Sequence, residues 1–429
     1  MNRVITISML LSSMLMAEDS EAKIFLEKVA NNVNQTAQEL YKEVESDLEY
    51  KGNVAVESAY FNHDMDNKRD NQSAFRFELE GKYQLKKNQK FVAKVKGIYD
   101  TNDNKRRYLD FNELYFQHDF DKWNFLIGKN TRFWGAMEFY NQSDTFNSKD
   151  LLDNPFDYDS KLGSWNIAFS RFFDNGEFAL IAKLNEESQP MQEERSIYNF
   201  LPYRYDDKLD TDSDDVPTIY LKYSSSIEEH QIDYSVIYQN GYDEQRYIVP
   251  KLSRDSNTSE PTITMHQHAY TVDKFMGFGT MVKGDTLYKT ELAYTSSHDN
   301  KVADYAQGSV GLEHTLYGVY DKMDLGIIAE YYKYKAFQTK RYDSTYFKQL
   351  FDDDLALGAR LTFNDMDSSN ILVGLDVDRH NKEKFLFVDY DTRIDDKYKL
   401  KASFQHFDAK KESAFSDGNT LKVELKYHF

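Results

Sequence analysis

Residues 421–429 read Leu421-Lys422-Val423-Glu424-Leu425-Lys426-Tyr427-His428-Phe429, and this segment decides the fold class. Apolar or aromatic side chains occupy every second position, and charged or polar side chains occupy the positions between them. Successive side chains of a β-strand point to opposite faces of the sheet. The segment therefore predicts a strand with one apolar face and one charged face.

The same alternation recurs upstream. In one example, Phe75, Phe77 and Leu79 alternate with Arg76, Glu78 and Glu80, and comparable alternation occurs in 232–238, 355–363, 371–378 and 399–404. In a transmembrane barrel one face of each strand meets lipid and the other meets the lumen, so charges on the second face predict a water-filled interior. The aromatic C-terminal strand also resembles the signal by which the barrel assembly machinery of Gram-negative bacteria recognises its clients.

Segments of this kind number about 18, with 16 to 18 as the expected range, and most are close to the length that a tilted strand needs to cross the hydrocarbon. Short connections alternate with longer ones, as periplasmic turns alternate with extracellular loops in such barrels. An even number of strands places both strand termini in the periplasm. The expected strands are 52–62, 72–86, 90–100, 107–119, 122–132, 162–173, 177–186, 216–226, 230–240, 262–283, 285–297, 303–317, 322–336, 351–365, 368–379, 384–393, 397–408 and 419–429.

Composition supports an all-β transmembrane barrel over other classes. No run of about 18 apolar residues follows the N-terminal region, which excludes a bundle of membrane helices. The 32 Tyr and 30 Phe residues exceed what a soluble core needs and suit the aromatic girdles of a membrane barrel. The chain has no Cys, and its net charge of -19 argues against nucleic acid as a partner.

The N-terminus predicts export. A short basic region, Met1-Asn2-Arg3, precedes an apolar stretch that ends at Ala17, so residues 1–17 are expected to be a signal peptide. Residues 18–48 follow a helical pattern with a narrow apolar stripe. This amphipathic helix could be a coiled-coil seam, a plug in the lumen, an arm in the periplasm or a solvated leader. Residues 49–429 are expected to form the barrel.

The connection that follows the fifth expected strand is too apolar for a solvated loop. It begins Arg132-Phe133-Trp134-Gly135-Ala136-Met137-Glu138-Phe139-Tyr140-Asn141, and it carries further apolar residues up to Leu152. Folding back into the barrel would bury these side chains and narrow the pore, whereas the alternative is packing at the extracellular rim. The first arrangement predicts a constriction formed by Arg132, Trp134, Glu138, Asp144 and Lys149.

This connection also carries a resemblance to a known family. Arg132-Phe133-Trp134-Gly135-Ala136-Met137-Glu138 is similar to a motif in a poorly characterised, porin-like family of proteobacterial outer-membrane β-barrels, in which a Val-Thr-Glu variant replaces Ala136-Met137-Glu138. Segments that begin at Gly311, Asp324 and Asp354 resemble that family in the same order. The resemblance covers roughly residues 120 to 429. It implies the barrel, and it carries over no substrate and no site residues.

Other constellations of polar residues carry little chemistry. Asp210, Asp212 and Asp214 have the spacing that opens an EF-hand loop, but Asp215 stands where that loop needs Gly. A loose divalent-cation site in this acidic loop is an alternative to a plain solvated loop that faces lipopolysaccharide. His266 and His268 would share one face of a strand, yet no third zinc ligand is evident. We therefore expect no metal, no cofactor, no catalytic residue and no enzymatic activity.

The leading hypothesis is an outer-membrane, porin-like channel for passive diffusion of small solutes, narrowed by the connection at 133–161. The alternatives are a transporter of hydrophobic or lipid-like substrates with the N-terminal helix as a hatch, and a structural or adhesive envelope barrel. Expected partners are outer-membrane lipid and lipopolysaccharide, the barrel assembly machinery through the strand ending in Phe429, small solutes and, in a homo-oligomer, further copies of the chain. The side chains expected to line the lumen are Arg76, Glu78, Glu80, Lys82, Lys94, Lys96, Arg360, Asp376, Lys399 and Lys401.

Overall fold

The computed structural model describes residues 48–63, 67–152, 160–199, 204–211, 216–254, 261–340, 351–408 and 418–429. The expected signal peptide lies outside these residues, and so does the expected helix 18–48 except for Leu48, which begins the first strand. In the described part of the chain, no helix is both long enough and apolar enough to cross a membrane.

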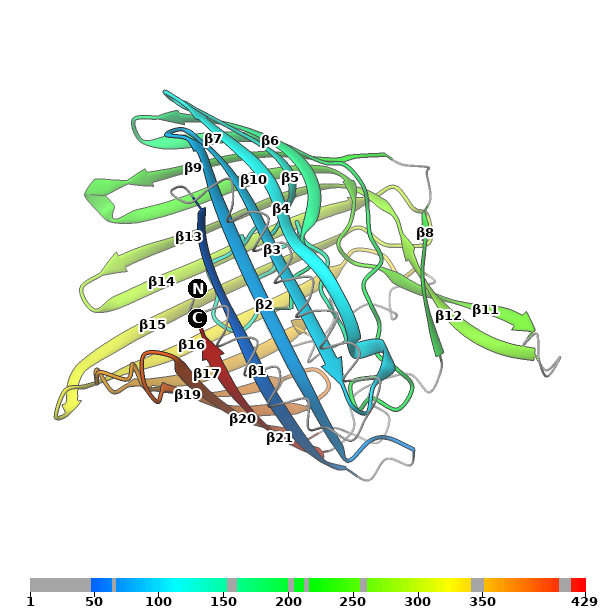
Figure 1. The fold of residues 1–429 in the computed structure, drawn as a ribbon. Coiled ribbons are helices and arrows are strands. Elements are labelled where there is room, and N and C mark those ends of the chain that lie inside the picture. Colours follow the sequence, from blue (N-terminus) through cyan, green and yellow to red (C-terminus); the bar gives the residue numbers. More distant parts are fainter. Residues whose placement is uncertain are drawn as a thin grey trace.

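Eighteen strands form one closed antiparallel barrel (Figure 1). Neighbours in the ring are also neighbours along the chain, apart from two insertions, and β1 pairs with β21 to close it. The prediction of an antiparallel barrel of about 18 strands is confirmed. Its strands are β1 (Leu48–His63), β2 (Asn71–Lys86), β3 (Gln89–Asp100), β4 (Arg107–Phe120), β5 (Trp123–Asn130), β6 (Ser164–Phe173), β7 (Gly176–Lys183), β9 (Thr218–Ile227), β10 (Ile232–Tyr242), β13 (Thr271–Lys283), β14 (Thr286–Ser297), β15 (Tyr305–Tyr320), β16 (Met323–Ala336), β17 (Asp353–Thr362), β18 (Asn370–Asp378), β19 (Lys384–Arg393), β20 (Tyr398–Asp408) and β21 (Gly418–His428).

The barrel is apolar outside and polar inside, and β14 shows why. Its period-two pattern sends Leu292 and Tyr294 outward, where they are 63% and 43% exposed. Glu291, which directly precedes Leu292 and points to the inner face, is fully buried. A soluble protein hides its apolar side chains and solvates its charges, whereas this distribution is the one that a barrel wall in lipid requires.

Short hairpins gather at one end of the barrel, on the left-hand side of Figure 1. Two of them turn through residues with positive φ, Gly284 (φ 60°) and Asp321 (φ 51°), a conformation that Gly and Asp tolerate in tight turns. The longer connections lie at the opposite end. Among the described residues, two short 3₁₀ turns lie outside the sheets, η1 (Asn104–Arg106) and η2 (Glu228–His230).

A second sheet of three strands stands beyond the long-loop end of the barrel (Figure 1). It consists of β8 (Arg204–Thr211), β11 (Tyr247–Arg254) and β12 (Pro261–Ala269). The prediction of one strand over 262–283 is wrong, because β12 ends at Ala269 and β13 begins at Thr271. The two strands belong to different sheets: β12 pairs with β11 and, in parallel, with β8, and β13 pairs with β10 and β14.

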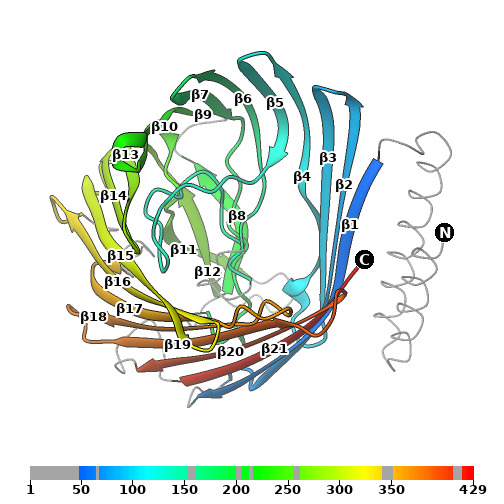
Figure 2. The ribbon, with the colours of Figure 1, turned by 90° about the vertical axis from the view of Figure 1, so that its left-hand side faces the viewer.

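The largest apolar core of the described residues lies inside the barrel. It joins Trp134 and Phe146, from the connection after β5, to inward-facing side chains of the wall such as Ile181, Tyr220 and Ile237. Figure 2 shows this connection, in teal, crossing the interior of the ring. The connection thus fills part of the lumen beside β5 to β16, and a cavity lined by polar and charged residues lies beside β18 to β3.

Candidate functional site

The connection between β5 and β6 forms an internal loop, of which residues 131–152 and 160–163 are described. A sharp turn at its start depends on Gly135, whose φ is +148°. A Cβ atom at Gly135 would lie 2.1 Å from Oδ1 of Asn141, which itself accepts a hydrogen bond from Met137 N at 2.9 Å. Only glycine fits this backbone, so the turn that aims the loop inward is encoded locally.

Glu291 of β14 is the first anchor of the internal loop. Its Oε1 accepts hydrogen bonds from Ala136 N at 2.7 Å and from Met137 N at 3.4 Å, and its Oε2 accepts one from Ser143 N at 2.9 Å. Buried backbone N–H groups need partners, and a carboxylate satisfies several at once. The wall therefore supplies the acceptors that the loop's irregular backbone lacks.

Glu330 of β16 is the second anchor. Its two oxygens accept hydrogen bonds from Glu138 N at 2.8 Å and Phe139 N at 3.1 Å. The neighbouring Tyr332 donates its hydroxyl hydrogen to Glu330 and accepts a hydrogen bond from Tyr140 N at 3.1 Å. These contacts fix the tip of the loop against β16.

Glycines in the wall make room for the loop's side chains. Gly358 of β17 and Gly374 of β18 are cross-strand partners on the inner face. A Cβ atom at Gly374 would lie 2.6 Å from Cε1 of Phe139 and 2.3 Å from Cε1 of Phe387, and one at Gly358 would lie 2.8 Å from Cζ of Phe139. The two rings occupy the space that side chains at these positions would fill.

Four of the five residues predicted at the constriction lie within the packed interior of the internal loop. Trp134 is 4% exposed and packs on Phe146 and Tyr220. Asp144 forms an ion pair with Lys161, and burial raises its pKa. Burial also lowers the pKa of Lys149, whose ammonium lies 5.5 Å from the ring centroid of Tyr140, and lowers the pKa of Arg132 to about 10. A direct role of these four at a constriction stays a prediction.

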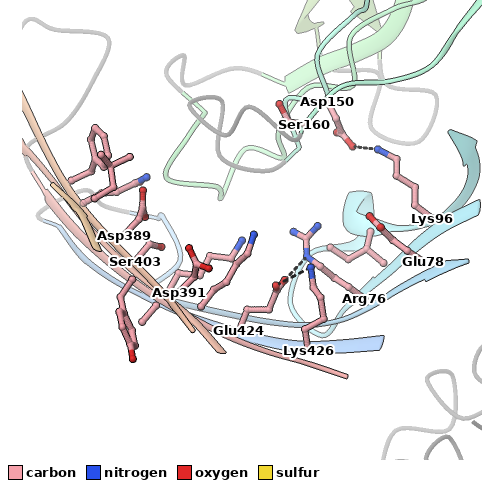
Figure 3. A pocket seen from close by; sticks show the side chains of 18 of the residues that line it. Arg76, Glu78, Lys96, Asp150, Ser160, Asp389, Asp391, Ser403, Glu424 and Lys426 are labelled. Carbon is pink, nitrogen blue, oxygen red and sulfur yellow. Dashed lines mark hydrogen bonds and ion pairs between the residues drawn. The ribbon is translucent and has the colours of Figure 1, made fainter. Parts of the chain in front are cut away.

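The remaining member, Glu138, reaches an open cavity of about 420 Å³ between the internal loop and the facing wall. Glu138 also pairs with Arg360 at 2.5 Å, and Arg360 pairs with Glu313 of β15 at 2.8 Å. Figure 3 shows the cavity, with Asp150 and Ser160 of the loop on one side and the barrel wall on the other. The cavity lies in the polar part of the lumen.

Charged side chains of both signs line the facing wall. Arg76 contacts Glu57 at 2.7 Å, Lys422 contacts Glu57 at 3.0 Å and Lys426 contacts Glu424 at 3.2 Å. The cavity lining includes the basic residues Arg76, Lys96, Lys401, Lys422 and Lys426 and the acidic residues Glu78, Glu138, Asp150, Asp376, Asp389, Asp391 and Glu424. A permeating ion would therefore meet paired charges of both signs.

The residues predicted to line the lumen fall into two groups. Arg76, Glu78, Lys96, Asp376 and Lys401 line this cavity. Glu80, Lys82 and Lys94 share their strand faces with lining residues, and Lys399 pairs with Asp391 at 2.6 Å. Arg360 contacts the loop through Glu138. Their part in permeation stays a prediction.

Sequence reasoning missed the two anchors. The period-two pattern of 288–294, in which Tyr288, Leu292 and Tyr294 face outward, would have placed Glu291 inside the barrel. Sequence reasoning also missed Arg106, which is 2% exposed and forms ion pairs with Glu57 and Asp100, each at 2.5 Å. No local pattern marks Arg106, because it lies in a short 3₁₀ turn outside the alternating strands.

Comparisons with known proteins relate the chain to solved barrels by fold alone. No protein-family model matches, and no curated protein is similar. Similar structures include OccAB4 and OccAB1 of Acinetobacter baumannii and OccK3 (OpdO) of Pseudomonas aeruginosa, each with a TM-score of 0.54. In that order, their sequences are 10%, 8% and 9% identical to this one. The matched regions cover 90%, 90% and 92% of this chain, and 99%, 98% and 99% of the three similar chains. Identities this low show the shared barrel architecture and say nothing of a solute.

Proposed function

We propose that the protein is a porin-like channel of the Gram-negative outer membrane that admits small polar solutes by passive diffusion. The observation that carries the proposal is the charged cavity of about 420 Å³ beside the internal loop, inside a closed barrel. The outer face supports a membrane location. Large apolar side chains are exposed on strands around the ring; Val423 and Leu425 of β21, for example, are 41% and 44% exposed. A water-soluble monomer rarely exposes a continuous apolar surface of this kind, whereas a barrel in lipid does.

The orientation follows the rule for such barrels. Short hairpins face the periplasm, and the longer loops, together with the sheet of β8, β11 and β12, face outward from the cell. Because the lining cations Arg76, Lys96, Lys422 and Lys426 each have a carboxylate within 4 Å, we expect weak ion selectivity.

Single-channel recording in planar bilayers tests this function. Purified protein should produce discrete conductance steps in KCl, with a reversal potential near zero in a salt gradient. Ser403→Trp, which adds an indole inside the cavity, should lower the step size. The matched variant Val423→Trp adds the same group to the lipid-facing side of the neighbouring strand and should leave the step unchanged. Protein that inserts but opens no steps would refute the proposal.

A further inference from the structure

One side of the cavity is aromatic. Phe385 and Phe387 of β19 lie 5.7 Å apart between ring centroids, and Phe385 stacks on Phe407 of β20 at 4.4 Å. Phe139, from the tip of the internal loop, meets Phe387 edge-on at 5.8 Å. Phe139, Phe385 and Phe387 line the cavity and are all partly exposed. A strip of ring surface therefore faces the solute path.

A carboxylate without a cationic partner lies beside these rings. Asp376 of β18 is the cross-strand partner of Phe385 on the inner face, and it lines the same cavity. Its Oδ1 is buried and has no hydrogen-bond partner among the described residues, and the same holds for Oδ1 of Asp354, on the adjacent strand. Asp354 is itself 0% exposed, and the two carboxyl groups interact electrostatically. Neither forms an ion pair within the described part of the chain. Because two carboxyl groups this close share a proton, the pair holds at most one negative charge, and no cation of the described residues offsets it.

The adjoining wall of the cavity, from β20 to β2, has no comparable excess of positive charge. Arg76 and Lys422 both contact Glu57, and Lys426 contacts Glu424. Lys401 lies between Asp391 and Glu424 in the strand register. An anion at Arg76, Lys422 or Lys426 would compete with carboxylates already in place, whereas a cation would reach Asp376 without a competing cation among the described residues.

Rings and a carboxylate together suit one class of ligand. The face of an aromatic ring attracts a cation, and a carboxylate accepts charge-assisted hydrogen bonds from an ammonium group. We infer that this side of the cavity binds small organic cations, with an ammonium group at Asp376 and an apolar group against Phe385 and Phe387. The inference rests on the proposed channel function and names the class of solute that the channel holds longest.

The test uses three probes of similar size: benzylammonium, benzoate and benzyl alcohol. Added to a conducting channel in KCl, benzylammonium should reduce the mean current in a concentration-dependent manner, and the other two should not. Asp376→Asn should weaken the apparent affinity for benzylammonium at least tenfold. Asp391→Asn removes the same charge from the same cavity at a carboxylate already paired with Lys399, and it should change the affinity less than threefold.

A second variant separates binding from folding. Phe387→Leu keeps most of the apolar volume but removes the ring, and it should weaken block by benzylammonium, measured as the fraction of that variant's own unblocked current. Equal block by benzoate, or an equal effect of Asp376→Asn and Asp391→Asn, would overturn the inference. If the protein opens no steps at all, the proposed channel function fails instead; calorimetric titration of the detergent-solubilised protein with benzylammonium then decides separately whether the site exists.

Discussion

The attachment of the internal loop to the wall is open to a direct test through Glu291. Glu291→Gln keeps the size of the side chain but leaves one carbonyl oxygen where the carboxylate offered two. In the wild type, the backbone amides of Ala136, Met137 and Ser143 all donate hydrogen bonds to the two carboxylate oxygens. In the variant at least one of these backbone amides faces the side-chain NH₂ group of glutamine. That group is a hydrogen-bond donor, so it cannot accept the hydrogen of the backbone amide.

The size of the effect follows from the number of amides left without an acceptor. A buried donor without a partner costs about 1–3 kcal/mol, and hydrogen bonds to a charged group are worth more than neutral ones. One or two such amides give a loss of about 2–4 kcal/mol in the free energy that holds the loop in place. The equilibrium between released and docked loop then shifts by roughly 30- to 1,000-fold.

Hydrogen exchange followed by mass spectrometry measures this shift on the peptide that spans 133–145. The amides of that peptide should be protected in the wild type and should exchange faster in Glu291→Gln by about the factor given above. Glu313→Gln is the control, because Glu313 faces the same lumen and contacts the side chains of Lys289 and Arg360 but none of these amides. Unchanged protection in Glu291→Gln would refute the anchoring role.

Three further outcomes are expected. Gly374→Ala should lower the unfolding temperature in detergent, since overpacking costs about 1–3 kcal/mol. Gly81→Ala is the control, because a Cβ atom at Gly81 would meet no atom within 4 Å, and equal effects of the two variants would contradict the packing at Gly374. Arg106→Met removes a buried cation from Asp100 and Glu57, and of the two only Glu57 keeps other cationic partners among the described residues, Arg76 and Lys422. The expected cost of about 3–5 kcal/mol would lower the urea midpoint, and an unchanged midpoint would exclude it. Burial raises the pKa of Glu244, in the loop after β10, to about 8. Folding therefore favours the protonated form of Glu244, and the free energy of unfolding should fall as the pH rises from about 4.5, the pKa in the unfolded chain, to about 8. Glu244→Gln should reduce this dependence on pH. An equal dependence in the variant and the wild type would count against the raised pKa of Glu244.

The strands of the barrel were predictable because their signal is local. The alternation in 421–429 matches the inward Glu424 and the outward Leu425 of β21, and comparable patterns locate most other strands to within a few residues. The second sheet escaped prediction for the opposite reason. β8 pairs in parallel with β12, about 60 residues later, and the acidic sequence of 204–211 shows no alternation. Such a pairing leaves no periodic trace in either segment.

The site was predictable only in part. The apolar composition of 133–152 demanded a place to bury its side chains, and the barrel interior provides it. The acceptors that hold the loop lie far along the chain, at Glu291 and Glu330, so spacing could not identify them. The segments that carried the family resemblance nevertheless meet here: Glu330 binds the loop amides, and Gly358 and Arg360 contact Phe139 and Glu138.

Closure of the ring has a consequence for how the chain reaches its native state. β1 pairs with β21 along Asn53 to His63, so the first described strand finds its last partner only when the whole chain is available. Until then two open edges expose unpaired backbone groups, which is the feature of partly formed sheets that invites aggregation. Contacts between such distant segments also make the search slow. The rate-limiting event in assembly is therefore expected to be the meeting of β1 and β21, and escort of the nascent chain up to that moment matters more than the stability of any single hairpin.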